Sequence, residues 1–349
     1  MSRATEESAR RSMEGRTTAD PFRIFGSEIS PYSVKVRSYF RYKGIPHEWI
    51  ERSNAVMDEY KKYAKLPLIP VVVTPEDVGL QDSTLIIERL ESSFPEPPID
   101  PKNPALAFLS ALIEEFADEW GNKWMFHYRW ARPLDQDSAA DRIARSLMPD
   151  LDAGQYEGIA AKIKARMITR GGYVGSNEQT APQIESTFKE FVLQLDAHLA
   201  GRSFLFGQCP SLGDFGLWGQ LYSAWTDPTC NEIIEADGAN IVPWIERMLD
   251  PKASGNFEDW DALAPTLMPI LRDHVGGLFL PWTDANAKAL EGGESEYHVE
   301  LRCGTWRQSP QKYHARSLAM LRARYAAVDE RTELDGILAE AACLKWLAV

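Results

Sequence analysis

Ser30 and Pro31 are the first residues along the chain whose types and order suggest chemistry. Ser30 precedes a stretch of apolar residues at helical spacing, 31–44, so it is a natural helix N-cap, with Pro31 in the first turn. The same position suits a second role, because a serine hydroxyl and the free N–H groups of a helix N-terminus can stabilise a bound thiolate. Capping is the commoner use of such a serine, and both interpretations stay open at this stage.

A second candidate lies at Ile69-Pro70, directly before the apolar run 71–73. A proline fits the first position of a strand because it has no N–H group to offer the ladder. With a cis bond before Pro70, the backbone N–H and C=O of Ile69 would face a peptide-like ligand. Pro67 is the rival position for such a bond, and Pro70 is preferred because it adjoins the strand. A plain strand-opening proline is the alternative.

Asp82 and Ser83 form the third candidate, at the start of another expected helix. Either residue can cap that helix, which is the simpler interpretation. The N–H groups of the helix end and the Ser83 hydroxyl can also bind a carboxylate, and Asp82 can pair with an ammonium group.

The elements that position these residues follow from periodicity, caps and prolines. The early order is β-α-β-α-β-β-α, with strands at 22–26, 47–51, 71–73 and 78–80 and helices at 31–44, 56–65 and 83–93. Later helices are expected at 104–130, 138–149, 155–169, 181–200, 212–225, 240–249, 262–274, 281–290, 310–329 and 333–347, with a single strand at 297–303.

Composition divides the chain into five segments. Five prolines within 94–104 cannot continue a helix and mark a linker. The predicted segments are a disordered tail (1–20), an α/β domain (21–94), the linker (95–104), an all-helical domain (105–290) and a C-terminal extension (291–349).

Charge and cysteine content narrow the classes of function. A net charge of −13 without a segregated basic patch argues against binding to nucleic acid or an anionic membrane. The apolar runs are too short to span a bilayer, and the first 20 residues lack the apolar core of a secretory signal. The cysteines lack CxxC spacing and the histidines are scattered, so we expect free thiols, a cytoplasmic location and no metal site.

The motifs and their spacing resemble the cytosolic glutathione transferase superfamily. Ser30-Pro31-Tyr32 is similar to the Cys-Pro-Phe of omega-like members, and theta-like members carry a serine at the helix head. Ile69-Pro70 and Asp82-Ser83 are similar to the Val-Pro and the later Glu-Ser of the same pattern. In 210–219, Ser211 and Asp214 resemble a structural capping box of the family's C-terminal domain.

The resemblance implies an α/β thioredoxin-like N-terminal domain plus an all-α C-terminal domain, in a homodimer with glutathione as co-substrate. Ser30 would activate the glutathione sulfur, while a set of five residues would bind glutathione: Tyr32, Ile69, Pro70, Asp82 and Ser83. The helix head carries Ser30 and Ser33 where a redox CxxC would stand, so disulfide exchange through the enzyme is not expected.

The second substrate would be an apolar small-molecule electrophile. The helix at 114–130 is dense in aromatic residues, and the equivalent helix of the family faces the active-site cleft. A pocket could be lined by Trp120, Trp124, His127 and Trp130, with Lys123 or Arg129 stabilising negative charge on a leaving group. The alternative is that this aromatic stripe belongs to the core. A non-catalytic ligand-binding or scaffold protein of the same fold is the alternative function, kept open by the extension.

Overall fold

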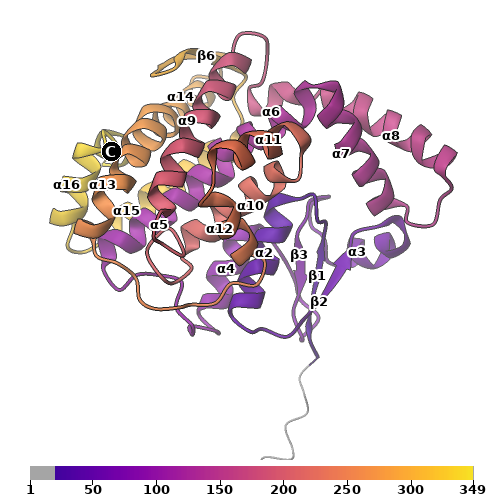
Figure 1. Ribbon diagram of the computed structural model, residues 1–349, viewed down its shortest axis with the longest axis horizontal. Helices are drawn as coiled ribbons and strands as arrows, with labels where there is room; N and C mark the ends of the chain where they lie inside the picture. Colours follow the sequence, from indigo (N-terminus) through magenta and orange to yellow (C-terminus); the bar gives the residue numbers. More distant parts are fainter. Residues whose placement is uncertain (1–19, 349) are drawn as a thin grey trace, which may run out of the picture.

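The computed structural model describes residues 20–348 of the chain. The predicted disordered tail, residues 1–20, therefore lies outside the described residues except for Asp20. An α/β layer occupies the lower part of Figure 1, and helices cover it from above. The C-terminal end of the chain lies toward the left of that view.

The N-terminal domain contains a four-stranded sheet with the order β2-β1-β3-β4. Strand β1 is parallel to β2 and antiparallel to β3, and β3 is antiparallel to β4. The elements are β1 (Phe22–Gly26), α2 (Pro31–Tyr42), β2 (His47–Glu51), a 3-10 turn (Asn54–Val56), α3 (Met57–Tyr63), β3 (Val71–Val73), β4 (Gly79–Gln81) and α4 (Ser83–Glu91). The predicted β-α-β-α-β-β-α order is confirmed.

Alternation along the strands builds two different cores, because successive side chains point to opposite faces of a sheet. Ile24 and Val72 pack on one face in the same cluster as residues of α2 and α4. Phe25, Val71 and Val73 pack on the other face with Tyr60 of α3. The face with α2 and α4 also joins the main core of the helical domain. The sheet is therefore held to that domain through α2 and α4.

The helical domain follows the proline-rich linker. Its elements are α5 (Pro104–Phe116), the π-helical segment η2 (Ala117–Gly121), α6 (Asn122–Ala131), α7 (Pro133–Leu147), α8 (Ala153–Ile168), the 3-10 turn η3 (Gly171–Val174), α9 (Ala181–Leu199), α10 (Leu212–Trp225), α11 (Pro228–Asp237), α12 (Ile241–Arg247), α13 (Trp260–Ile270), the π-helical segment η4 (Leu271–Phe279) and α14 (Leu280–Glu291).

Most predicted helices of this domain are confirmed, including those at 181–200 and 212–225. Three expectations for this domain were wrong, and the first two concern α7 and α11. Helix α7 begins at Pro133, before the predicted start, and α11 was missed altogether. Pro228 occupies the first turn of α11, which is the signal that could have identified this helix.

The break predicted between residues 274 and 281 is also absent, because η4 joins α13 to α14. Pro281 has no N–H group and cannot donate to the carbonyl of Gly277, four residues earlier. That carbonyl instead accepts a hydrogen bond of 3.3 Å from the backbone N–H of Arg302. The wide π-helical turn thereby becomes an attachment point for the C-terminal extension.

The extension forms a hairpin and three helices: β5 (Tyr297–Leu301), β6 (Gly304–Gln308), α15 (Lys312–Ala326), α16 (Thr332–Glu340) and α17 (Leu344–Leu347). The single strand predicted at 297–303 is therefore only half of a hairpin, since Gly304, with φ at +120°, permits the reversal. Trp306, Leu334 and Cys343 are wholly buried in the main core. The extension is therefore part of the folded body.

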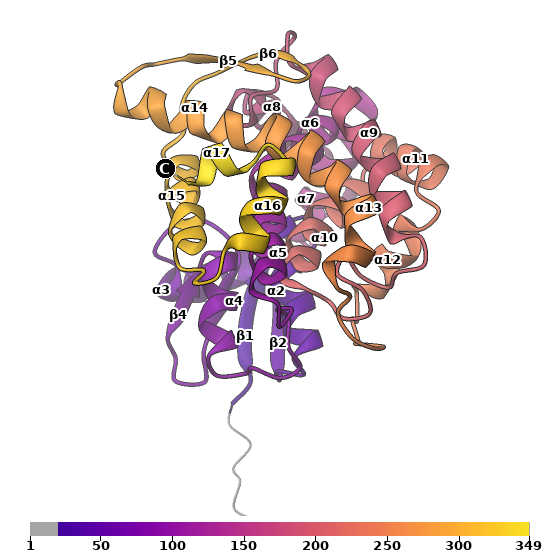
Figure 2. The same cartoon turned by 90° about the vertical axis from the view of Figure 1, so that its left-hand side faces the viewer.

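Helix α15 connects the hairpin side of the molecule to the α/β domain. Figure 2 shows α15 descending from below the hairpin toward α4. Near its end, Arg324 forms an ion pair with Glu88 of α4, and the Tyr325 ring packs 5.9 Å from that of Phe108 in α5. The extension thus contacts both domains. Among residues 20–348, no helix combines the length and the apolar character needed to cross a membrane.

We predict that Gly276→Ala destabilises the protein by about 3 kcal/mol through overpacking. A Cβ atom at Gly276 would lie 2.1 Å from the backbone oxygen of Ala341, so η4 and the extension would have to separate. Gly336 of α16 is the matched control, since a Cβ atom there meets nothing within 4 Å. Gly336→Ala should be neutral or stabilising. Denaturant unfolding measures both variants, and equal stability of the two would contradict the tight contact.

We also predict a pH dependence from His274, which is wholly buried between the rings of Phe116, Trp124 and Phe191. Burial lowers the pKa of His274 to about 3, while the unfolded chain has a histidine pKa near 6.5. Between these values the unfolded state binds more protons, so stability falls as the pH falls from 6.5 toward 3.

His274→Phe should reduce the slope of the unfolding free energy against pH in this window by about 1.4 kcal/mol per pH unit, the value for one proton. Phe191→Leu is the control, because it disturbs the same cluster without removing a titratable group. It should lower stability and leave the slope unchanged. An unaltered slope in His274→Phe would show that this histidine does not contribute.

Candidate functional site

Strand register brings the three candidate motifs to one end of the sheet. Phe25, near the end of β1, pairs with Val71 at the start of β3, and Val71 also pairs with Gln81 at the end of β4. Ser30 follows β1, Ile69-Pro70 precedes β3, and Asp82-Ser83 follows β4. The predicted residues therefore gather at the end of the sheet where α2 and α4 begin. We call this end of the sheet the candidate site.

Ser30 caps α2 as predicted. Its Oγ atom accepts a hydrogen bond of 3.3 Å from the N–H of Ser33, and its backbone oxygen accepts one of 3.1 Å from Val34. A hydroxyl has two lone pairs and one O–H donor, so capping leaves the O–H group able to donate. Capping and donation to a ligand are thus compatible in one geometry. The side chain is half-buried and close to the free N–H groups of the helix.

The bond between Ile69 and Pro70 is cis, which confirms the preference for Pro70 over Pro67. Ile69 itself is half-buried. Its backbone N–H and C=O form no hydrogen bond with another residue of the described range 20–348. Both groups therefore remain able to pair with the backbone of a ligand.

Asp82 occupies an unusual backbone conformation, with φ at +79°, a region that aspartate tolerates better than most residues. Its carboxylate caps α4 by accepting a hydrogen bond of 3.5 Å from Leu85, and Ser83 is buried beside it. Such backbone conformations persist where the surroundings impose them, and they concentrate at ligand sites. The observation supports Asp82 as a candidate binding residue.

A buried ion cluster lies beneath the candidate site. The ammonium group of Lys35, in α2, contacts Glu114 and lies 2.6 Å from Oδ2 of Asp118. Thr84 of α4 donates a hydrogen bond of 2.6 Å to the same Glu114. Burial lowers the pKa of Lys35, but Asp118 and Glu114 raise it above its ordinary value. We call Lys35, Glu114, Asp118 and Thr84 the lysine cluster.

Tyr32 joins the candidate site to this cluster. Its hydroxyl donates a hydrogen bond of 3.0 Å to the backbone oxygen of Asp118, which lies in η2. Burial raises the pKa of the Asp118 carboxyl to about 7, although Lys35 opposes that shift. The sequence prediction missed Lys35, Glu114 and Asp118. Charged residues on otherwise apolar helix faces are the signal that could have identified them.

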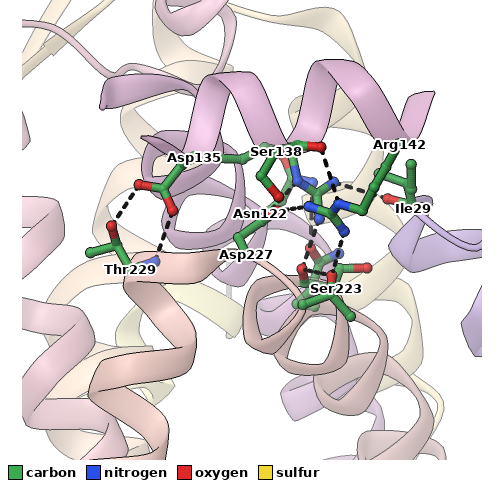
Figure 3. A network of polar contacts seen from close by, with 11 residues as sticks. Ile29, Asn122, Asp135, Ser138, Arg142, Ser223, Asp227 and Thr229 are labelled. Carbon is green, nitrogen blue, oxygen red and sulfur yellow. Dashed lines mark hydrogen bonds and ion pairs between the residues drawn. The ribbon is translucent and has the colours of Figure 1, made fainter. Parts of the chain in front are cut away.

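A second ion network holds the loop before Ser30. Arg129 of α6 donates to the backbone oxygen of Ile29 at 2.9 Å and to Oδ2 of Asp227 at 2.7 Å. Arg142 pairs with the other oxygen of Asp227, as Figure 3 shows together with Ile29 and Ser223. Arg129 was a candidate for stabilising a leaving group, but its three donor nitrogens bond to Asp227, Ile29 and Ser223. It acts here by positioning the loop.

The predicted electrophile residues are buried among the C-terminal helices. Trp120, Lys123, Trp124 and His127 expose between 1% and 3% of their surface. The Lys123 ammonium lies 3.7 Å from the ring centre of Trp282, 5.3 Å from Trp306 and 5.6 Å from Trp120. It also donates to the backbone oxygen of Val174 at 3.0 Å. Burial lowers its pKa to about 7, while Glu119 raises it.

Trp124 and His127 also make their contacts within the protein core. The ring of Trp124 packs 4.7 Å from Phe191, and its Nε1 donates to Thr187 at 3.2 Å. Nε2 of His127 lies 3.1 Å from the carboxylate of Glu185, and its Nδ1 lies 2.7 Å from the Ser176 hydroxyl. These contacts favour the core interpretation of the aromatic stripe. Within residues 20–348, no group of three or more histidine, cysteine, aspartate or glutamate residues is arranged to hold a metal ion.

The fold defines a class: a thioredoxin-like domain followed by an all-helical domain. A family model described as glutathione S-transferase, N-terminal domain, matches residues 24–98, and one described as glutathione S-transferase, C-terminal domain, matches residues 178–255. The chain therefore belongs to the cytosolic glutathione transferase superfamily. The theta-like or omega-like subtype stays a prediction.

Similarity to individual proteins is more distant. The chain is 29% identical over 99 residues to a stringent starvation protein A homolog of Haemophilus ducreyi, covering 28% of this chain and 46% of that protein. It is 26% identical over 102 residues to glutathione S-transferase U2 of Arabidopsis thaliana, covering 28% and 44%. The matches thus span about half the length of these curated relatives.

Among solved structures, the β-etherase LigF of Sphingobium sp. strain SYK-6 matches 66% of this chain and 95% of its own. The identity is 17% and the TM-score is 0.47.

We predict that Arg129→Met costs about 3–5 kcal/mol of stability, because it leaves the buried Asp227 without one of its two cationic partners. Arg145→Met is the matched control, since Arg145 forms an exposed pair with Asp141 one helical turn away, and such pairs contribute only about 0.5 kcal/mol. Thermal or denaturant unfolding compares the two. Similar losses in both variants would contradict a structural role for the Arg129 network.

Proposed function

We propose that the chain is a glutathione transferase that binds glutathione at the candidate site and transfers its sulfur to an apolar electrophile. The observation that carries this proposal is the meeting of Ser30, Ile69-Pro70 and Asp82-Ser83 at one end of the sheet. Each supplies a group that suits a different part of the tripeptide.

Ser30 would act on the thiol of glutathione. The Ser30 O–H group would donate to the sulfur, and the N-terminus of α2 would add partial positive charge. A free thiol has a pKa near 8.5, and each unit of depression corresponds to about 1.4 kcal/mol of preferential stabilisation of the thiolate. One or two units would leave much of the bound thiol ionised at neutral pH.

The remaining groups would hold the tripeptide in place. Ile69 would pair with the cysteinyl backbone, with Pro70 fixing its position, and the ring of Tyr32 would contact the ligand at the helix head. Ser83 and the N-terminus of α4 would bind the γ-glutamyl carboxylate, while Asp82 would pair with its ammonium group. When both substrates are bound, the sulfur is held facing the electrophile, so the reaction no longer depends on a random encounter between two molecules in solution.

The reaction that follows is nucleophilic substitution or addition. The thiol proton passes to solvent, the sulfur forms a bond to carbon, and in a substitution the leaving group departs with its electron pair. A hydroxyl in place of a helix-head cysteine favours conjugation over exchange through an enzyme disulfide. The burial of Trp120, Lys123, Trp124 and His127 argues against these residues as the electrophile pocket.

The rival proposal is a non-catalytic ligand-binding or scaffold protein of the same fold. The burial of the aromatic stripe favours this rival proposal, because those side chains are then not available to line a pocket for the electrophile. We further propose a cytoplasmic location, since the four cysteines are unpaired, and a homodimer, for which light scattering in solution would give the mass.

We predict that glutathione binds at millimolar concentration or better, and that Ser30→Gly raises the pKa of the bound thiol by one to two units. Glycine is the informative substitution because it keeps most of the capping free energy while removing the hydroxyl. Ser30→Thr is the control and should retain a low thiol pKa. Calorimetry measures binding, and the ultraviolet absorbance of the thiolate measures the pKa.

Turnover of an aryl halide separates the two proposals. Under the enzyme proposal, Ser30→Gly lowers kcat/KM by about tenfold for each unit by which the pKa of the bound thiol rises, when turnover is measured at a pH below that pKa. Absence of glutathione binding by the unmodified chain would exclude both the enzyme and the site assignments. Binding without turnover would favour the non-catalytic protein.

A further inference from the structure

The lysine cluster has fewer hydrogen-bond donors than its acceptors require. An ammonium group has three N–H donors, and those of Lys35 point to Glu114, to Oδ2 of Asp118 at 2.6 Å and to Oγ1 of Thr84 at 3.3 Å. The Thr84 hydroxyl donates in turn to Oε1 of Glu114, the oxygen that Lys35 already contacts. Within residues 20–348, Oε2 of Glu114 and Oδ1 of Asp118 are buried without a hydrogen-bond partner. Two acceptor atoms therefore remain without a donor.

The cluster also has an excess of negative charge when both of its acids are ionised. One ammonium group then faces two carboxylates, and Thr84 is neutral. Lys35 and Glu114 are wholly buried and Asp118 is 7% exposed, so water does not compensate for the unbalanced charge. A neutral carboxyl group loses far less free energy than a carboxylate when it leaves water. Burial accordingly raises the pKa of Asp118 to about 7, although Lys35 opposes the shift.

Helices α2 and α10 bring no second positive charge to the cluster. The Tyr32 hydroxyl of α2 donates to the backbone oxygen of Asp118, at 3.0 Å, and not to the carboxylate. Helix α10 packs on Glu114 at Gly216, where a Cβ atom would lie 2.8 Å from Cγ of Glu114. The one charged residue of α10, Asp214, is itself an acid.

Helix α15 meets the acids that neighbour the cluster in the sequence. His314 pairs with Glu119, and Ser317 donates a hydrogen bond to Glu115. Burial raises the pKa of Glu115 well above its usual value. The histidine of α15 is thus engaged by Glu119, and its hydroxyl donor by Glu115, so neither neutralises the surplus charge of the cluster.

We propose that the lysine cluster is a proton-binding site between the two domains, with the proton on Oδ1 of Asp118 up to about neutral pH. The O–H group supplies a donor where the cluster lacks one, and it leaves one ammonium group facing one carboxylate. Loss of the proton creates a buried negative charge between α2, which Ser30 caps, and the helical domain. The contact between the domains is therefore most stable with the proton bound. This inference goes beyond the proposed function and does not depend on glutathione.

The sign of the pH dependence follows from where the proton is held. An unfolded aspartate has a pKa near 3.9, so between about pH 4 and pH 7 the folded chain binds the Asp118 proton and the unfolded chain does not. The stability that this proton contributes is complete below the unfolded pKa and is lost as the pH rises through the folded one. Since His274 has the opposite sign, variants must be compared with the unmodified chain.

Asp118→Asn tests the site in the full chain, because it keeps the shape of the side chain and removes the titrating proton. We expect the unfolding equilibrium constant of the unmodified chain, divided by that of Asp118→Asn, to rise about tenfold per pH unit between about pH 5 and pH 6.5. Asp135→Asn is the matched control, since Asp135 is also wholly buried but both of its oxygens accept hydrogen bonds from Thr229. The ratio for the control should change little in this window.

Infrared spectroscopy supplies a second measurement, which does not require unfolding. A protonated carboxyl group has a C=O stretching band separate from the bands of a carboxylate. The unmodified chain should show such a band at about pH 6 that weakens by about pH 8 and that Asp118→Asn lacks, whereas Asp135→Asn should retain it. Asp118→Ser is the second neutral variant, for use if the asparagine variant does not fold.

Two results would overturn the proposal. One is a ratio of unfolding constants for Asp118→Asn that stays constant with pH. The other is an infrared band that both Asp118 variants retain and that Glu114→Gln or Glu115→Gln removes, because the proton would then lie on a different acid.

Discussion

The buried ammonium group of Lys35 is the interaction on which the rest of the structure depends. It lies on the helix that Ser30 caps, and it is wholly buried between Glu114 and Asp118 of the helical domain. A charge removed from water must be paired, so the two domains have little freedom to shift. The backbone reinforces this constraint, because a Cβ atom at Gly219 of α10 would lie only 2.5 Å from the carbonyl of Pro31. The head of α2 is therefore positioned by the partner domain.

Local signals in the sequence predicted the α/β domain and its candidate residues. Ser30 and Asp82 are caps, and Pro70 adjoins a strand, so each is recognisable from a few neighbouring residues. The supports of the site are different. Lys35 meets Glu114 and Arg129 meets Ile29 across long stretches of chain. A charged residue on an apolar helix face signals burial, but one sequence does not show which residue it pairs with. The positions of the candidate residues were thus more predictable than the network that fixes their geometry.

The aromatic helix and the extension also have features whose role depends on tertiary contacts and could not be decided from the sequence. The stripe through Trp120 and Trp124 has the composition of either a pocket or a core, and only its partners decide between them. Those partners include Trp306, which belongs to a strand that the sequence prediction missed. The path of α15 could not be predicted either, because it is set by tertiary contacts such as those of Asn286 and Glu119.

The three tryptophans around Lys123 give the molecule a built-in spectroscopic reporter. Trp120, Trp282 and Trp306 come from η2, α14 and β6, and all are nearly free of solvent contact. Indole emission in such surroundings is shifted to the blue, and a nearby cation alters its intensity. Because one of the three rings is carried by the extension, separation of the hairpin from the helical domain would hydrate all three together. These three of the 11 tryptophans therefore report on the docking of the C-terminal segment without any added label.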